Sequence, residues 1–183
     1  HNGIIENYRD LKKELIDNGY FFHSETDSEV VVHLLDFYYD GNMIEALKKV
    51  IKRIQGSYAL CIVSTLEPDC IYVTKKDSPL VLGKNNHASF GASDIPALLD
   101  YTKDVYFIED YEIVKLCKNN LTFYNQDGIE ISKKPTHIPY DNEAAKKGGY
   151  DTFMLKEIHE QPYAISETLR GRIKANDLIV LPE

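Results

Sequence analysis

Apolar residues follow a helical period over the first part of the chain. Segments 7–18, 27–39 and 43–54 each carry apolar side chains three and four residues apart, with polar residues between them. This spacing predicts three amphipathic helices that each bury one face. An apolar stretch at 1–5 predicts a strand before the first helix, and the aromatic residues at 20–22 predict a short strand after it.

From Gly56 onward the pattern changes to runs of β-branched and aromatic residues separated by turn-forming residues. The predicted strands cover 57–66, 70–74, 80–83, 87–91, 104–108, 111–117 and 120–124, with a short helical turn over 95–99. Helices followed by many strands, without regular alternation of the two, indicate an α+β sandwich rather than a doubly wound sheet.

A change of composition after Pro139 predicts a domain boundary. Residues 140–150 are polar and contain two adjacent glycines, as is typical of a linker. Residues 1–139 would then form one domain, and residues 151–183 would begin another. The elements predicted in this last part are a helix over 151–161 that stops at Pro162, a helix over 163–170 and a strand over 178–181.

The dipeptide Asn2-Gly3 is the first candidate for function. Asn-Gly is a common turn, but a hairpin needs a second strand, and here a helix with Asn7 as its N-cap follows. The Asn2 amide and the backbone N–H groups beside Gly3 are donors that a reacting oxygen can approach closely. Two such donors at a strand end could form an oxyanion hole.

The acidic segment 24–30 is the second candidate. Thr26 and Glu29 have the spacing of a capping box at the start of a helix. Asp27 falls at the first helical position, where its charge favours the positive end of the helix dipole. From the residues alone, this structural role is the simplest interpretation of Asp27.

The charge and hydropathy of the chain exclude some partners. The net charge is −8 and no basic run stands out, which argues against binding to a phosphate backbone. No stretch approaches the roughly 20 apolar residues of a membrane-spanning helix, and the first residues lack the pattern of a secretory signal. We therefore expect no nucleic acid and no membrane as partner.

The cysteines and histidines show no pattern of a metal or redox site. The three cysteines are Cys61, Cys70 and Cys117. They form no Cys-x-x-Cys pair, so we expect reduced thiols in the core of a cytoplasmic protein. A catalytic pair of one cysteine with His23, His33 or His87 is the alternative. The histidines lack the spacing of metal ligands, and we expect no metal site.

Motifs spread along the whole chain occur in a characteristic order. They are His1-Asn2-Gly3-Ile4-Ile5-Glu6-Asn7, Ser24-Glu25-Thr26-Asp27-Ser28-Glu29, Ser78-Pro79-Leu80-Val81-Leu82-Gly83 and Ala92-Ser93-Asp94. This combination resembles the glutaminase half of the glucosamine-6-phosphate synthase family. The tail motifs are Lys156-Glu157-Ile158-His159-Glu160-Gln161-Pro162 and Leu169-Arg170-Gly171-Arg172-Ile173. They resemble the junction at which the sugar isomerase domain of that family begins.

The resemblance implies a four-layer αββα sandwich of the N-terminal-nucleophile hydrolase type, of which this chain would supply part, with a helical segment after it. Members of the family begin with a cysteine whose thiol attacks glutamine, and His1 would match a position well inside their first domain. We therefore expect a truncated glutaminase domain over 1–139 that is inactive by itself. By the same resemblance, Asn2 and Gly3 would supply the oxyanion hole, and Asp27 would hold the α-ammonium group of glutamine.

The family also implies a reaction and its partners. The complete enzyme is a glutamine-dependent aminotransferase that converts fructose 6-phosphate and glutamine to glucosamine 6-phosphate and glutamate, for amino sugar biosynthesis. The resemblance thus implies a cytoplasmic homodimer without a cofactor, in which the isomerase domain binds fructose 6-phosphate. Another amidotransferase of the same class, such as the purine-pathway enzyme, is one alternative, although the motif at 156–162 argues against it. A non-catalytic binding or regulatory domain is the other.

Overall fold

A computed structural model describes residues 1–139 and 150–169 of the chain. The chain divides after Pro139 into two compact units. Among the described residues, the first unit holds every strand and every helix except α5, which lies in the second unit. No helix in these two described ranges is long and apolar enough to cross a membrane.

The three long helices of the first unit confirm the helical spacing in the sequence. They are α1 (Tyr8–Asp17), α2 (Ser28–Tyr38) and α3 (Met43–Ile51), and a short 3₁₀ turn, η1, spans Ile95–Ala97. Gly19 follows α1 with a φ of 91°, a value that suits a glycine just beyond a helix end. At the start of α3, the side chain of Asn42 accepts hydrogen bonds from two backbone N–H groups of the first turn.

The strands form two antiparallel sheets. Sheet A has the order β1 (Asn2–Ile5), β2 (Gly56–Val63), β3 (Cys70–Lys76), β7 (Ile113–Cys117), β8 (Asn120–Tyr124) and β9 (Glu130–Ile131). Sheet B has the order β10 (Thr136–His137), β6 (Asp104–Phe107), β4 (Val81–Lys84) and β5 (Ser89–Ala92). The seven strands that the sequence predicts after Gly56 are present with small shifts of their ends. The additional strands, β9 and β10, have two residues each and are too short to leave a pattern.

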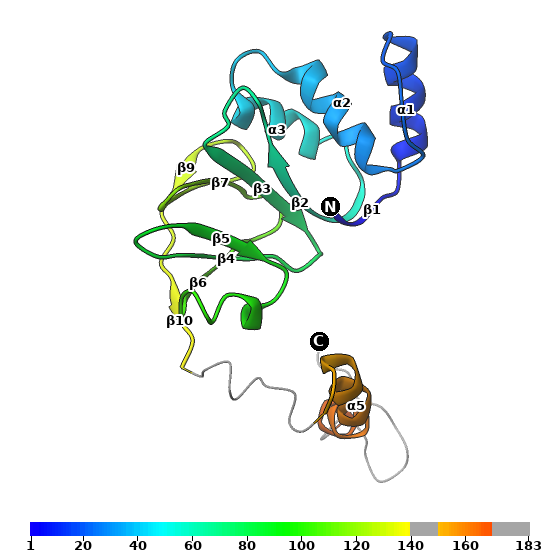
Figure 1. The fold of residues 1–183 in the computed structure, drawn as a ribbon. Coiled ribbons are helices and arrows are strands. Elements are labelled where there is room, and N and C mark those ends of the chain that lie inside the picture. The colour runs from blue at the N-terminus through cyan, green and yellow to red at the C-terminus, as the bar shows by residue number, and fades with distance from the viewer. Residues whose placement is uncertain (140–149, 170–183) are drawn as a thin grey trace. The chain divides into compact units, whose positions relative to one another are not determined.

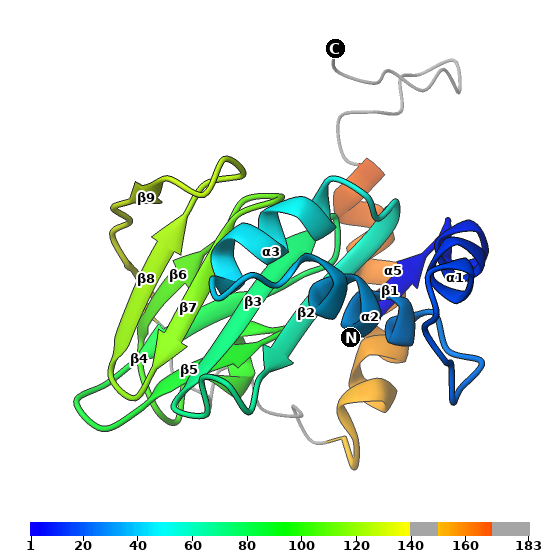
Figure 2. The same cartoon turned by 90° about the horizontal axis from the view of Figure 1, so that it is seen from above.

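Helices α2 and α3 cover one face of sheet A, with α1 beside α2, and sheet B lies against the other face (Figure 1). Viewed from above, α2 and α3 cross over the strands of sheet A (Figure 2). Successive side chains of β3 point to opposite faces of sheet A: Tyr72 packs under the helices, and Val73 packs between the two sheets. On β7, Ile113 and Val114 divide in the same way. The α+β class is confirmed, and the described residues supply one helical layer and two sheets.

The aromatic segment 20–22 is not a strand, so that prediction is wrong. The rings of Tyr20 and Phe22 pack against α2 instead, while Phe21 is exposed. The rings of Tyr20 and Phe22 lie 5.1 and 4.5 Å from the ring of His33. An aromatic run favours a strand only where another strand can pair with it, and here the neighbour is a helix.

Two of the cysteines also differ from the prediction of reduced thiols. Cys70 and Cys117 form a disulfide between β3 and β7, while Cys61 is free and exposed. The two residues are 47 positions apart, and only the pairing of the strands brings them together. No sequence spacing signals such a pair.

In the described part of the second unit, 150–169, α5 (Phe153–Leu169) is continuous and has Pro162 in its interior. The prediction that a helix stops at Pro162 and another begins at 163 is therefore wrong. Proline removes a single backbone donor, and the turns on both sides retain the helical conformation. Residues 140–149 of the predicted linker, which spans 140–150, and the predicted strand at 178–181 lie outside the described residues.

Candidate functional site

The pairing of β1 with β2 fixes the backbone at Gly3. Gly3 lies opposite Tyr58, and its φ is 103°. A Cβ atom built on Gly3 would lie 2.0 Å from the carbonyl oxygen of Ser57, far inside van der Waals contact. Glycine is therefore required here both by the backbone conformation and by the close approach of β2. The sequence alone indicates only the close approach of a reacting oxygen, because the approach of β2 depends on the fold.

Asn2 is on the same strand as Gly3. It lies opposite Ala59 of β2 and is exposed. Its side-chain amide makes no hydrogen bond to any residue in the described ranges, so both N–H donors are available to a ligand. The structure thus leaves a free donor beside a glycine whose conformation is fixed.

Asp27 joins the start of α2 to β1. One carboxylate oxygen, Oδ2, accepts a hydrogen bond of 2.7 Å from the backbone N–H of Ile5. The other, Oδ1, lies 3.8 Å from Nδ1 of His1. Asp27 is the N-cap residue of α2, but its side chain caps no backbone donor of the helix. Its carboxylate is therefore directed at β1 rather than at the helix that it precedes.

His1 extends the same arrangement. Its Nδ1 lies 2.7 Å from the hydroxyl oxygen of Ser28, the first residue of α2. His1, just before β1, therefore contacts Ser28, and Ile5, the last residue of β1, contacts Asp27, the residue before α2. The strand runs alongside the carboxylate of Asp27. The sequence reasoning did not select His1 or Ser28, because neither residue matched a recognised chemical pattern.

Glu29 organises the loop before α2 differently from the predicted capping box. Its carboxylate accepts hydrogen bonds of 2.7 Å from the N–H groups of both His23 and Ser24, and one of 2.5 Å from the Ser24 hydroxyl. The hydroxyl of Thr26 caps no helix donor; its oxygen lies 2.9 Å from that of Ser24. The hydrogen bonds from Ser24 and His23 lower the pKa of Glu29 from 4.5 to about 2.

Asn7 connects β1 to the segment that leads into β2. Its side-chain amide donates to the carbonyl of Arg53 and accepts from the N–H of Gln55, both at 2.9 Å. The prediction that Asn7 caps α1 is correct in position, but its side chain makes no capping hydrogen bond. Together with the pairing of β1 and β2, these bonds hold the backbone of Asn2 and Gly3 in place.

A groove of about 580 Å³ opens beside these residues. His1 and Ser28 line it, together with apolar residues of α2, with Met43 of α3 and with residues 60–66 of β2 and the following turn. Among the lining residues is the free Cys61. Packing around its thiol raises the pKa of Cys61, which reduces the thiolate fraction and weakens it as a nucleophile.

The described residues hold no activated thiol. Cys70 and Cys117 are bonded to each other. The predicted alternative was a cysteine paired with His23, His33 or His87, and no hydrogen bond among the described residues joins a cysteine to any of these histidines. The same residues contain no group of three His, Cys, Asp or Glu side chains that could hold a metal ion.

The structure therefore brings Asp27 against β1, which carries Asn2 and Gly3. This assembly can offer hydrogen-bond donors to an anionic oxygen from Asn2 and Gly3, and a carboxylate to a cation from Asp27. Glu29, Asn7 and His1 support it and were not selected as site residues. Their roles depend on tertiary contacts up to 48 residues apart in the sequence, which no local pattern reports.

A family profile described as a glutamine amidotransferase domain matches residues 1–100. Several curated relatives carry the name glutamine–fructose-6-phosphate aminotransferase (isomerizing). The relative from Caldanaerobacter subterraneus subsp. tengcongensis is 54% identical over 99% of this chain, and that from Clostridium acetobutylicum is 49% identical over its whole length. In both cases the chain spans 30% of the length of the relative.

Solved structures give the same fold at lower identity. A glutamine phosphoribosylpyrophosphate amidotransferase from B. subtilis, in complex with ADP and GMP, matches with a TM-score of 0.59 and 22% identity. The match covers 68% of this chain and 28% of that one. A structure titled as the allosteric regulatory enzyme of purine biosynthesis matches with the same score and identity.

Proposed function

Because this chain belongs to the glutamine amidotransferase domain family, we propose that it is part of an enzyme that transfers the amide nitrogen of glutamine to fructose 6-phosphate. The observation that carries the proposal is 54% identity, over 99% of the chain, to a relative named for that reaction. The identity extends through the tail motif at 156–162, which resembles the start of a sugar isomerase domain.

In this proposal Asn2 and Gly3 form the oxyanion hole. Attack on the side-chain amide of glutamine gives a tetrahedral intermediate with a negative oxygen, and fixed donors lower its free energy. The free amide of Asn2 and the rigid backbone at Gly3 suit this role, because donors already in position need no reorganisation during the reaction. The nucleophile would be the N-terminal cysteine of the complete enzyme, activated by its own α-amine.

Asp27 holds the α-ammonium group of glutamine in the same proposal. The hydrogen bond from Ile5 to Oδ2 fixes the orientation of the carboxylate. Oδ1 accepts no hydrogen bond from the described residues and can therefore pair with a cation. A charge-assisted hydrogen bond of this kind contributes about 1.5–3 kcal/mol.

The remaining parts of the proposal concern the complete protein. Residues 1–139 would be the C-terminal portion of its glutaminase domain, 140–150 a linker and 151–183 the beginning of an isomerase domain. That isomerase domain would bind fructose 6-phosphate, and the enzyme would work as a cytoplasmic homodimer.

The experiment that tests this function compares two acceptors. The complete enzyme is supplied with glutamine and either fructose 6-phosphate or phosphoribosylpyrophosphate, and the products are identified by mass spectrometry. We expect glucosamine 6-phosphate with the first acceptor and no amine product with the second. Formation of phosphoribosylamine would favour the purine-pathway alternative, and the absence of both products would favour a non-catalytic domain.

A further inference from the structure

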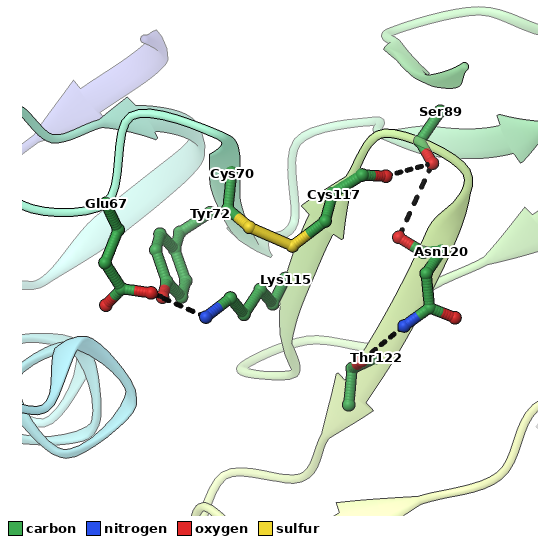
Figure 3. Close-up of a disulfide and its surroundings, with 8 residues drawn as sticks. All are labelled: Glu67, Cys70, Tyr72, Ser89, Lys115, Cys117, Asn120 and Thr122. Carbon is green, nitrogen blue, oxygen red and sulfur yellow. Dashed lines mark hydrogen bonds and ion pairs between the residues drawn. A yellow bond between two sulfur atoms is a disulfide. The ribbon is translucent and has the colours of Figure 1, made fainter. Parts of the chain in front are cut away.

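The disulfide lies at the end of the β3–β7 strand pair. Cys70 is the first residue of β3 and Cys117 the last of β7, and the two stand directly opposite each other in the register. Their Cα atoms are 4.4 Å apart, which lies within the range for disulfides. Figure 3 shows the sulfur–sulfur bond crossing between the two strands.

Both cysteines are partly exposed, so a small thiol or disulfide in solution can reach them. The hairpin that follows Cys117 joins sheet A to sheet B at this end. The hydroxyl of Ser89, on β5, donates hydrogen bonds to two carbonyl oxygens, that of Cys117 at 2.8 Å and that of Asn120 at 3.4 Å (Figure 3). The disulfide therefore sits at an accessible place where the two sheets are connected.

The turn between β2 and β3 is anchored beside the disulfide. The carboxylate of Glu67 accepts hydrogen bonds of 2.6 Å from the hydroxyl of Tyr72 and 2.5 Å from the ammonium of Lys115 (Figure 3). The bond to Lys115 lowers the pKa of Glu67, which keeps the carboxylate ionised at neutral pH. The turn is thus tied to β7 twice, through this ion pair and through Cys70.

The same turn forms a wall of the groove beside the candidate site. Ser64, Thr65 and Leu66 line that groove together with His1 and Ser28. Loss of the Cys70–Cys117 bond would leave the turn tied to β7 by the Glu67–Lys115 ion pair and by the backbone pairing of β3 with β7, which begins at Cys70. A change at the disulfide can therefore alter the mobility of the groove wall.

We propose that Cys70 and Cys117 are a reversible thiol–disulfide exchange site whose oxidation state sets the rigidity of turn 64–69. The oxidant is a small-molecule disulfide such as oxidised glutathione. One cysteine thiolate attacks a glutathione sulfur, which breaks the glutathione S–S bond and releases one glutathione. The other cysteine thiolate then attacks the mixed disulfide and releases the second. Two cysteine sulfurs are oxidised, two glutathione sulfurs are reduced, and the cysteine protons pass to the two glutathiones.

The first test counts free thiols in the 183-residue chain. The protein is equilibrated with oxidised glutathione or with dithiothreitol, denatured in acid, alkylated and weighed. We expect one alkylated cysteine after oxidation, assigned to Cys61 by peptide mapping, and three after reduction. Three alkylated cysteines, or glutathione retained on Cys70 or Cys117, after oxidation would overturn the proposal.

The second test measures how the disulfide changes the thermal stability of the chain and the mobility of turn 64–69. Closing a loop of 47 residues should raise the thermal midpoint of the oxidised chain by about 8–16 °C over the reduced chain. Hydrogen exchange at residues 64–69, which occurs by local opening, should slow on oxidation, and exchange in α3 should slow only as far as the higher global stability accounts for. Equal exchange of the turn in both states would contradict the proposed link to the groove.

Matched variants assign the response to this pair. Cys61→Ser should keep the whole midpoint difference between oxidised and reduced protein, and the double variant Cys70→Ser with Cys117→Ser should lose it. A difference that persists in the double variant would overturn the assignment. If the double variant does not fold, the thiol count and the exchange data on the natural sequence decide. These measurements do not depend on glutaminase activity, so the proposed function can fail while this proposal stands.

Discussion

Asp27 directs its two carboxylate oxygens at different partners. Oδ2 accepts a hydrogen bond from the backbone N–H of Ile5, while Oδ1 lies 3.8 Å from Nδ1 of His1. In the complete enzyme, Asp27→Asn keeps an acceptor for Ile5 and removes the negative charge. We expect the KM for glutamine to rise by roughly 10- to 150-fold with little change in kcat, because about 1.5–3 kcal/mol of binding is lost.

Glu25→Gln is the matched control for this prediction. Glu25 lies two residues from Asp27, and its side chain is 99% exposed, so the glutamine KM should stay at the wild-type value. If the KM of Asp27→Asn stays within threefold of wild type while the melting temperature falls, Asp27 serves only to join α2 to β1.

Gly3 and Gly41 share a φ of 103° but differ in their surroundings. A Cβ on Gly3 would collide with the backbone of Ser57, while a Cβ on Gly41 would meet nothing within 4 Å. We expect Gly41→Ala to lower the free energy of unfolding by about 1–2 kcal/mol through backbone strain alone. Gly3→Ala should lower it by at least about 3 kcal/mol. Urea unfolding of both variants checks this, and equal losses would mean that β1 is not held closely against β2.

At the scale of elements, the loop before α2 depends on one ionised side chain. The pKa of Glu29 in the folded protein is about 2, below its ordinary value of 4.5. The stabilisation by the carboxylate is therefore fully present above about pH 4.5 and is lost as the pH falls toward 2. Glu29→Gln should lower stability at neutral pH and flatten the dependence of stability on pH across this window.

Chemical unfolding between pH 2 and pH 7 measures the effect. Other carboxylates also titrate in this range, so the informative quantity is the difference between wild type and variant at each pH. Glu25→Gln, in the same loop, should leave that profile unchanged. Parallel profiles for wild type and Glu29→Gln would contradict the role assigned to the three hydrogen bonds from His23 and Ser24.

The regular elements could largely be predicted from the sequence. Helices α1 to α3 each bury an apolar stripe, and a stripe at helical spacing is a local property that the sequence displays directly. The segment 20–22 and Pro162 are the failures, since a strand needs a partner that sequence does not supply and one proline need not end a helix.

The candidate site was predictable only in part. Asn2, Gly3 and Asp27 were predicted as site residues through motifs that resemble a known family, since a turn and a helix start are the simplest interpretations of these residues alone. Glu29 and Asn7 could not be predicted as site residues, because each acts through backbone groups that folding brings near. At the scale of the whole molecule, the Cys70–Cys117 pair depends on the register of two distant strands, so counting cysteines predicted the wrong oxidation state.

The whole first unit presents Asn2 at one edge of sheet A, on a backbone fixed by Gly3 and Asn7. A donor aimed at charge that exists only in the transition state affects kcat rather than KM. Asn86 offers a matched control, since it is an exposed asparagine in the turn between β4 and β5, and Asn86→Ala should leave the kinetics unchanged.

The most direct measurement of the proposed glutaminase role is therefore the kinetics of Asn2→Ala in the complete enzyme, with the melting temperature taken on the same preparation. The account predicts a fall in the kcat of glutamine hydrolysis by about 10²–10³ with nearly unchanged KM and melting temperature. A kcat within threefold of wild type together with a clearly lower melting temperature would contradict it, and would show that Asn2 only shapes the start of β1.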